Sequence, residues 1–206
     1  MKKKGAMDEG NHYTQAGDER RLEIIRTAYL QIAKNGIGGL RIREVAEAVG
    51  INNATLHYYF PTKEDLIKTV VDYLGHLFME THSPDMMVDE TSTPREKLKQ
   101  YFVDLEYQIN ISPERFIVMD ELFLQALRES NIQHFFDAQQ NWLNHLKPLI
   151  QAGINTGDFK PNIDAEQVAL VIVTFCLGLP LLGNIQPEKM IQAIRQFEKS
   201  LDIMMS

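Results

Sequence analysis

The nine residues from Asn52 to Phe60, Asn-Asn-Ala-Thr-Leu-His-Tyr-Tyr-Phe, are rich in side chains that could hydrogen-bond to a nucleic acid. Leu56 and Phe60 are four residues apart, so in a helix they share one face, which we expect to be buried. The polar side chains on the other faces are then directed largely outward: Asn53, Thr55, His57 and Tyr58. Their amide, hydroxyl, imidazole and phenol groups could contact base edges and phosphates, and their methyl and ring groups could contact thymine.

Two short helices joined by a tight turn are predicted to present these residues. The first covers residues 42–49, and Gly50 ends it, because glycine readily adopts the left-handed conformation that caps a helix. The second covers residues 53–59 and stops at Pro61. This is the geometry that places a recognition helix in the DNA major groove. A surface pair of helices with ordinary solvated side chains would show the same pattern.

Three cations flank the pair at helix starts, where backbone amides are free to bind phosphate: Arg41, Arg43 and Lys63. The 206-residue chain has a net charge of −7, which by itself argues against a nucleic-acid partner. The charge is unevenly distributed, however. Residues 1–63 carry ten Lys and Arg against seven Asp and Glu, whereas residues 64–206 carry eleven against twenty-one. Contact with nucleic acid is therefore expected through the N-terminal part alone.

The hydrophobic periodicity is helical nearly throughout, and it predicts an all-α protein of about nine helices. A first helix is expected over residues 19–35 with Asp18 as its N-cap. Further starts are marked by capping and proline signals at Thr62, Thr93, Ser112, Asp164 and Pro187, and by periodicity near Asn131. We expect residues 1–17 to be a disordered arm or a remnant of cloning, residues 18–64 a helix-turn-helix domain, and residues 65–206 a second helical domain. A long helix over about 63–81 links the two.

Several classes of protein are excluded by what the sequence lacks. The single cysteine, Cys176, cannot form an internal disulfide, and the basic N-terminus has no apolar stretch typical of a signal peptide. The apolar segment 168–182 is shorter than the roughly 20 residues that span a bilayer, and it contains glycine and proline. No nucleophile elbow, P-loop or dinucleotide fingerprint occurs. We expect a cytoplasmic protein without a cofactor or a membrane partner.

The segment GLRIREVAEAVGINNATLHYYFPTKEDL (residues 39–66) resembles the N-terminal DNA-binding domain of the Tet-repressor (TetR/AcrR) family of bacterial transcriptional regulators. The resemblance covers residues 19–75, and INTGDFKPNIDAEQVA (residues 154–169) is similar to the approach to the family's penultimate helix. It implies that seven residues lie at DNA-contacting positions: Arg43, Asn52, Asn53, Thr55, His57, Tyr58 and Lys63.

Three residues depart from the family's pattern. Arg41 replaces a small hydroxyl residue that caps the first short helix, Asn53 stands where Lys or Arg is common, and Ala54 stands where Gly is common. Fewer cations on the recognition helix imply fewer phosphate contacts and a weaker dependence of binding on salt.

The resemblance implies that the second domain dimerises and binds a small molecule. Residues 168–182 are apolar on all sides, and the last helix carries an apolar stripe, so we expect a four-helix interface between two subunits. The interface residues are predicted to be Val168, Val171, Ile172, Phe175, Leu179, Met190, Ile194, Phe197 and Leu201. Packing within one subunit is the alternative.

A ligand pocket is expected among seven residues of the central helices: Tyr101, Phe102, Leu105, Met119, Phe123, Phe135 and Trp142. As a set they favour a largely apolar ligand, although each could equally belong to the core. Glu106, Asp120 and Glu121 could balance a cationic ligand if they face inward. No metal site is predicted, because the evenly spaced Asp72, His76 and Glu80 are typical of an exposed helix face. Cys176 is expected to be buried and inert, with a redox role as the alternative.

The sequence therefore predicts a homodimeric repressor that binds a palindromic operator on double-stranded DNA and is released by a small, largely apolar effector. Two alternatives remain. The same fold could act as an activator or answer to a protein partner, and, more remotely, the chain could be an all-α enzyme.

Overall fold

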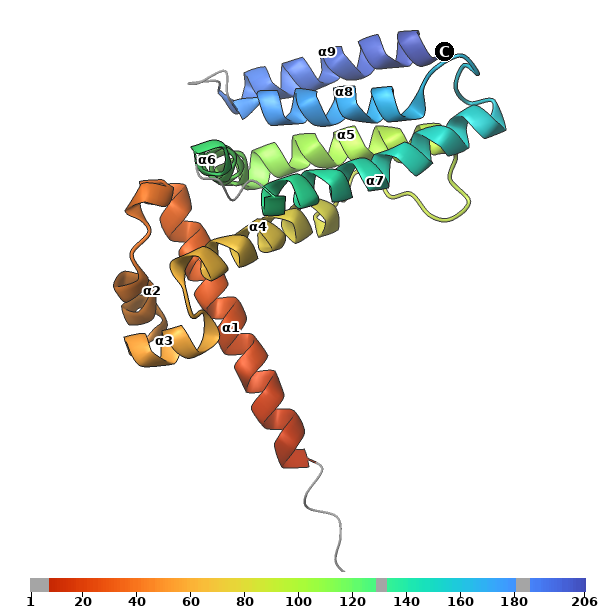
Figure 1. Ribbon diagram of the computed structural model, residues 1–206. Coiled ribbons are helices and arrows are strands. Elements are labelled where there is room, and N and C mark those ends of the chain that lie inside the picture. Colours follow the sequence, from red (N-terminus) through yellow and green to blue (C-terminus); the bar gives the residue numbers. More distant parts are fainter. Residues whose placement is uncertain (1–7, 129–132, 181–185) are drawn as a thin grey trace, which may run out of the picture. The chain divides into compact units, whose positions relative to one another are not determined.

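The computed structural model describes residues 8–128, 133–180 and 186–206. For residues 8–16 and 133–136 it describes the backbone alone. These residues form nine α-helices and one 3-10 turn, and no strand occurs among them (Figure 1). The predicted all-α class is confirmed. The chain divides into two compact units, one up to Tyr73 and the other from Leu74 onward. The elements are α1 (Asp8–Asn35), a 3-10 turn (Ile37–Gly39), α2 (Ile42–Val49), α3 (Asn53–Tyr59), α4 (Lys63–Glu80), α5 (Pro94–Ile111), α6 (Glu114–Arg128), α7 (Gln133–Thr156), α8 (Ala165–Gly178) and α9 (Pro187–Met205).

The N-terminal unit is built around one face of α1. Side chains from α1, α2, α3 and the first part of α4 meet in its core, where fully burying one such side chain contributes about 1.5–3 kcal/mol. The contacts of α1 with α2, and of α2 with α3, place the two short helices on this core. The most deeply buried members are Ile24, Ala28, Ile32, Val45, Leu56, Leu66 and Val70.

The start of α1 differs from the prediction. The helix begins at Asp8, so Asp18 lies inside it and is not an N-cap. Residues 8–17, expected as part of an arm, are helical here, and residues 1–7 lie outside the described part of the chain. Gly10 and Gly17 each weaken a helix by about 1 kcal/mol without ending it, and acidic residues at the first positions favour the positive end of the helix dipole.

The other helix starts follow the local signals in the sequence. Thr62 and Asp65 exchange hydrogen bonds at the start of α4, with the Asp65 amide donating to Thr62 Oγ1 at 3.0 Å. Thr93 and Glu96 form a complete capping box before α5. Asp164 accepts hydrogen bonds from two backbone amides at the start of α8, and Pro187 is the first residue of α9. The predicted start near Asn131 lies outside the described residues.

The C-terminal unit stacks its long helices in two layers. In Figure 1, α5 and α7 run side by side, with α8 on α7 and α9 on α5. The apolar α8 supplies much of the core through its inner face. No helix in the described part of the chain is long and apolar enough to cross a membrane. Large, fully buried side chains come from four of these helices: Phe102, Ile109, Ile150, Ile172 and Ile194.

Gly153 of α7 lies against the buried ring of Phe159, and a Cβ atom at this position would lie 2.1 Å from the ring carbon Cδ2. We expect Gly153→Ala to destabilise the protein, because a clash inside a packed core costs about 1–3 kcal/mol and outweighs the gain in helix propensity. The matched control is Gly75→Ala in α4, where no atom lies within 4 Å of the added methyl group and a stabilisation of up to about 1 kcal/mol is expected. Urea unfolding of both variants tests this. Equal effects would contradict it.

Candidate nucleic-acid interface

A tight turn at Gly50 joins α2 to α3. Gly50 has φ 72° and ψ 32°, the left-handed conformation, and its amide donates to the Glu47 carbonyl at 3.1 Å. The Ile51 amide donates to the Ala46 carbonyl at 2.9 Å. These two bonds form the Schellman motif, which satisfies the last carbonyls of α2 and turns the chain sharply. The predicted helix-turn-helix geometry is confirmed with its expected bounds.

Asn52 starts α3 as its N-cap. Its Oδ1 atom accepts hydrogen bonds from the Thr55 amide at 2.8 Å and from the Thr55 hydroxyl at 3.1 Å. The side-chain amide nitrogen of Asn52 can still donate a hydrogen bond to DNA. The hydroxyl oxygen of Thr55 can still accept one. Two of the predicted contact residues therefore also fix the start of the recognition helix.

The two faces of α3 differ as the spacing predicted. Leu56 and Phe60 are buried, and the Arg21 guanidinium covers the Phe60 ring at 5.1 Å. Tyr58 is 83% exposed, His57 is exposed, and Asn53 is partly exposed. The Tyr58 ring meets the Tyr59 ring edge to face, with 5.4 Å between the centroids. An aromatic side chain with a hydroxyl tip thus projects from a helix whose opposite face is anchored in the core.

The hydrogen bond between His57 and Pro61 fixes the tautomer of the His57 ring. Nδ1 lies 3.2 Å from the Pro61 carbonyl oxygen, which can only accept, so Nδ1 carries a proton. In the neutral ring, Nε2 is then an acceptor, suited to the exocyclic amino groups of adenine or cytosine. In the charged ring, Nε2 becomes a donor, suited to guanine or phosphate.

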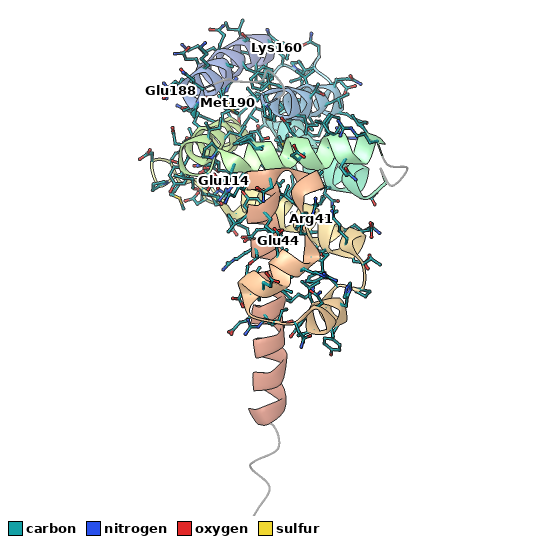
Figure 2. The ribbon with its side chains drawn as sticks, turned by 90° about the vertical axis from the view of Figure 1, so that its left-hand side faces the viewer. Arg41, Glu44, Glu114, Lys160, Glu188 and Met190 are labelled. Atoms are coloured by element: carbon teal, nitrogen blue, oxygen red, sulfur yellow. The ribbon has the colours of Figure 1, made fainter. Side chains whose placement is uncertain are left out.

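The flanking cations lie at helix starts. Arg41 precedes α2, and its guanidinium donates to the carbonyls of Gly38 at 2.6 Å and Leu40 at 3.3 Å (labelled in Figure 2). The Arg41 side chain does not cap α2. This agrees with the prediction made from the replacement of a small hydroxyl residue at this position. Arg43 is exposed on α2, and Lys63 is the first residue of α4 and partly exposed. Each can place a positive charge where backbone amides point outward.

Sequence reasoning missed one residue that supports this site. Arg20 of α1 donates to the Val49 carbonyl at 2.9 Å and pairs with Glu23 at 2.7 Å. It thereby ties the last turn of α2 to α1. No local pattern could reveal this contact, because the two partners are 29 residues apart.

The structure separates the predicted ligand-binding residues into two groups. Phe102, Leu105 and Met119 are buried in the core. Tyr101, Phe123 and Trp142 are partly exposed, and Trp142 Nε1 donates to the Tyr101 hydroxyl at 2.9 Å. The side chain of Phe135 lies outside the described residues. Of the predicted residues whose side chains are described, those of the second group retain solvent-exposed surface.

The predicted interface residues differ in their burial within the single chain. Six of the nine are buried there, as packing within one subunit would require: Val168, Ile172, Leu179, Met190, Ile194 and Leu201. Phe175 and Phe197 are partly exposed and stack on each other with 4.0 Å between their centroids. Val171 is 47% exposed, beside the exposed Leu170. The sequence could not separate the buried face of α8 from its exposed face, because the helix is apolar on all sides.

The acidic residues named as possible cation partners differ in their environments. Glu106 is paired with the Arg195 guanidinium through three contacts of 2.7–3.0 Å, so its charge is already balanced. Burial, with a smaller contribution from the neighbouring Glu121 charge, raises the pKa of Asp120 to about 6. His76 and Glu80 are exposed and 3.8 Å apart. No group of three metal-ligating side chains occurs among the described residues.

A recognition helix held by a Schellman turn, with an exposed polar face and cations at neighbouring helix starts, defines a helix-turn-helix DNA-binding regulator. Residues 24–70 match the bacterial regulatory proteins of the tetR family, and residues 97–198 match the tetracyclin repressor-like C-terminal domain. The chain belongs to the TetR family. Its assignment as a transcriptional regulator, and not as an enzyme, rests on this membership.

Known transcriptional regulators can be aligned with most of the chain. The HTH-type transcriptional repressor KstR2 of Mycolicibacterium smegmatis is 24% identical over 157 residues, which are 72% of each chain. The fatty acid metabolism regulator protein of Bacillus subtilis is 25% identical over 148 residues, covering 70% of this chain and 73% of that protein. The crystal structure of a TetR transcription regulator from Haloarcula marismortui matches with a TM-score of 0.78 at 25% identity, covering 91% and 98% of the two chains.

Cys176 is fully buried in α8, and burial raises the pKa of its thiol to about 12. Because only the thiolate reacts, about one thiol in 10⁴ is reactive at pH 8, against roughly a quarter of free cysteines. We expect iodoacetamide to alkylate the native protein at least about 100-fold more slowly than the urea-unfolded protein at pH 8. Similar rates would contradict the buried, inert thiol and favour a redox role.

Proposed function

We propose that this protein is a homodimeric repressor that binds a palindromic operator in the bacterial cytoplasm and is released from it by a small, largely apolar effector. The observation that carries the proposal is the reading face of α3, with Tyr58 and His57 exposed above the buried Leu56. Two such helices related by a two-fold axis would enter successive major grooves, about 34 Å apart. Related proteins are named as repressors, and this supports repression rather than activation.

The dimer is supported by exposed apolar surface in the C-terminal unit. Leu170 and Val171 on α8, and Ile203 and Met204 on α9, are large apolar side chains with 41–76% of their surface exposed. Such surface on two helices is suited to an isologous contact with a second copy.

An effector is supported by the aromatic side chains at the edge of the core. Tyr101, Phe123 and Trp142 combine apolar rings with a hydroxyl and an indole N–H, the mixture that orients a largely apolar ligand. The name of the Bacillus subtilis relative, a fatty acid metabolism regulator, agrees with an apolar ligand. The effector would act by binding better to a dimer whose two recognition helices have the wrong spacing for the operator.

Footprinting of the protein on the DNA upstream of its own gene tests the reading face. We expect the wild-type chain to protect a palindrome, and Tyr58→Ala to lose at least about tenfold in affinity, as removal of one base-contacting side chain does. The matched control is Met87→Ala, which truncates another exposed side chain, in the C-terminal unit. The folded state of each variant is checked by thermal unfolding. Unchanged protection by Tyr58→Ala would contradict the role of α3.

The salt dependence of binding tests the three flanking cations. Suppose that Arg41, Arg43 and Lys63 each neutralise one phosphate in both subunits. A plot of the logarithm of the binding constant against the logarithm of the salt concentration should then have a slope of about −5. Arg43→Ala should reduce this slope by about 2, because two contacts are lost per dimer. Fluorescence anisotropy measures both slopes, with Lys199→Ala, an exposed lysine of α9, as the control. An unchanged slope in Arg43→Ala would exclude its phosphate contact.

A further inference from the structure

The buried polar side chains of the described residues gather at one place, the end of α4. Burying such groups costs free energy unless they are hydrogen-bonded, so their concentration there calls for a physical reason. Side chains of α5 and α6 contact the last residues of α4 and the turn that follows it. The group consists of Ser83, Gln100, Asp104, Gln108 and Arg115.

Two of these residues bind carbonyls in the last turn of α4 and directly after it. Gln108 Nε2 donates to the carbonyls of Phe78 at 3.1 Å and Thr81 at 2.8 Å. Arg115 Nη1 donates to the Leu77 carbonyl at 3.2 Å. The last four carbonyls of a helix have no partner within it, and the negative end of the helix dipole favours a nearby cation. Side chains from two other helices therefore complete the end of α4.

Asp104 fixes the turn that follows. Its carboxylate accepts hydrogen bonds from the Ser83 amide at 2.7 Å, from Gln100 Nε2 at 2.5 Å and from His82 Nδ1 at 2.7 Å. Gln100, Asp104 and Gln108 are spaced four residues apart on α5, so they form one polar stripe along the face that meets the end of α4.

This network is incompletely satisfied. The Oε1 atoms of Gln100 and Gln108 are buried and have no donor among the described residues. A partly satisfied buried network is less stable than an apolar core of the same shape, so stability alone does not account for it. Buried polar groups can instead specify one arrangement of packed elements, and an unsatisfied network leaves a competing arrangement within reach.

Aromatic contacts connect the same turn of α4 to the residues proposed for the effector. The Phe78 ring meets the Phe116 ring edge to face at 5.3 Å between centroids and lies nearly parallel to the Trp142 ring at 6.3 Å. Trp142 in turn donates to the Tyr101 hydroxyl. A ligand that displaces Trp142 would therefore disturb Phe78, one of the residues whose carbonyl Gln108 holds.

We propose that Ser83, Gln100, Asp104, Gln108 and Arg115 form a polar latch that holds the end of α4, and that release of this latch is what lowers affinity for DNA. The consequence for DNA rests on the proposed function. α4 begins at Lys63 in the N-terminal unit and ends at Glu80 in the C-terminal unit, so the latch acts on the element that the two units share. Gln108 and Arg115 are positioning residues, which act through α4 and touch neither DNA nor effector.

The test compares hydrogen exchange and DNA affinity in the full-length chain. The variants are Gln108→Leu and Arg115→Met, which remove the donors, and Arg115→Lys, which keeps a charged donor. Gln151→Ala, an exposed glutamine of α7 that bonds Asn155, is the control. Exchange is measured without DNA in residues 77–83 and, as an internal reference, in α8. Affinity is measured on the protected upstream DNA.

We expect the donor-removing variants to exchange at least about tenfold faster in residues 77–83, with α8 within about twofold of wild type, because only the latch opens. Their affinity for the upstream DNA should fall at least about tenfold, and Arg115→Lys should retain most of the wild-type behaviour. An unchanged rate of hydrogen exchange in residues 77–83, or an equal increase of this rate in α8, would contradict the existence of the latch. Local acceleration with unchanged affinity would overturn its effect on DNA binding. A wild-type chain that binds no DNA would instead contradict the proposed function, and exchange alone would then decide the latch.

Discussion

The left-handed backbone at Gly50 determines where the recognition helix can lie. A side chain in this conformation costs roughly 1–2 kcal/mol, which glycine avoids. The Schellman bonds formed there reverse the chain within three residues, so that Asn52 can cap α3 and Leu56 can reach the core. Once Leu56 and Phe60 are buried, the helical period leaves Tyr58 and His57 facing solvent. The chemistry of the site therefore follows from one backbone conformation and two apolar anchors.

The C-terminal unit is organised around an uncharged core with a polar group at one end. Burial raises the pKa values of Tyr101 and Cys176, so both remain neutral over the physiological range. Their contact of 3.5 Å joins α5 to α8, and the Trp142 indole joins the same hydroxyl to α7. The acidic and basic side chains that are buried among the described residues, Asp104 and Arg115, lie instead beside the end of α4, where they bind backbone groups. The apolar part supplies stability and the polar part fixes one helix end.

Features set by a few neighbouring residues could be predicted from the sequence. The caps at Thr93 and Asp164, and the bounds of α2 and α3, depend on groups within five residues of each other. The start of α1 could not be predicted, because glycines weaken a helix by an amount that its other residues can outweigh. Which face of α8 is buried depends on tertiary packing, so the sequence could not show that six of the predicted interface residues are buried within the single chain. The four-residue spacing of Gln100, Asp104 and Gln108 was visible, but nothing local shows that they bind the end of α4.

Selection of bound sequences from random double-stranded DNA tests whether two copies of α3 read the operator. We expect enrichment of an inverted repeat whose half-site centres lie about one helical turn apart, since two recognition helices related by a two-fold axis enter successive major grooves. Tyr58→Ala should lose this enrichment while remaining folded, because the Tyr58 side chain is almost fully exposed. Enrichment of a single asymmetric site, or selection of the same repeat by Tyr58→Ala, would contradict recognition by paired copies of α3.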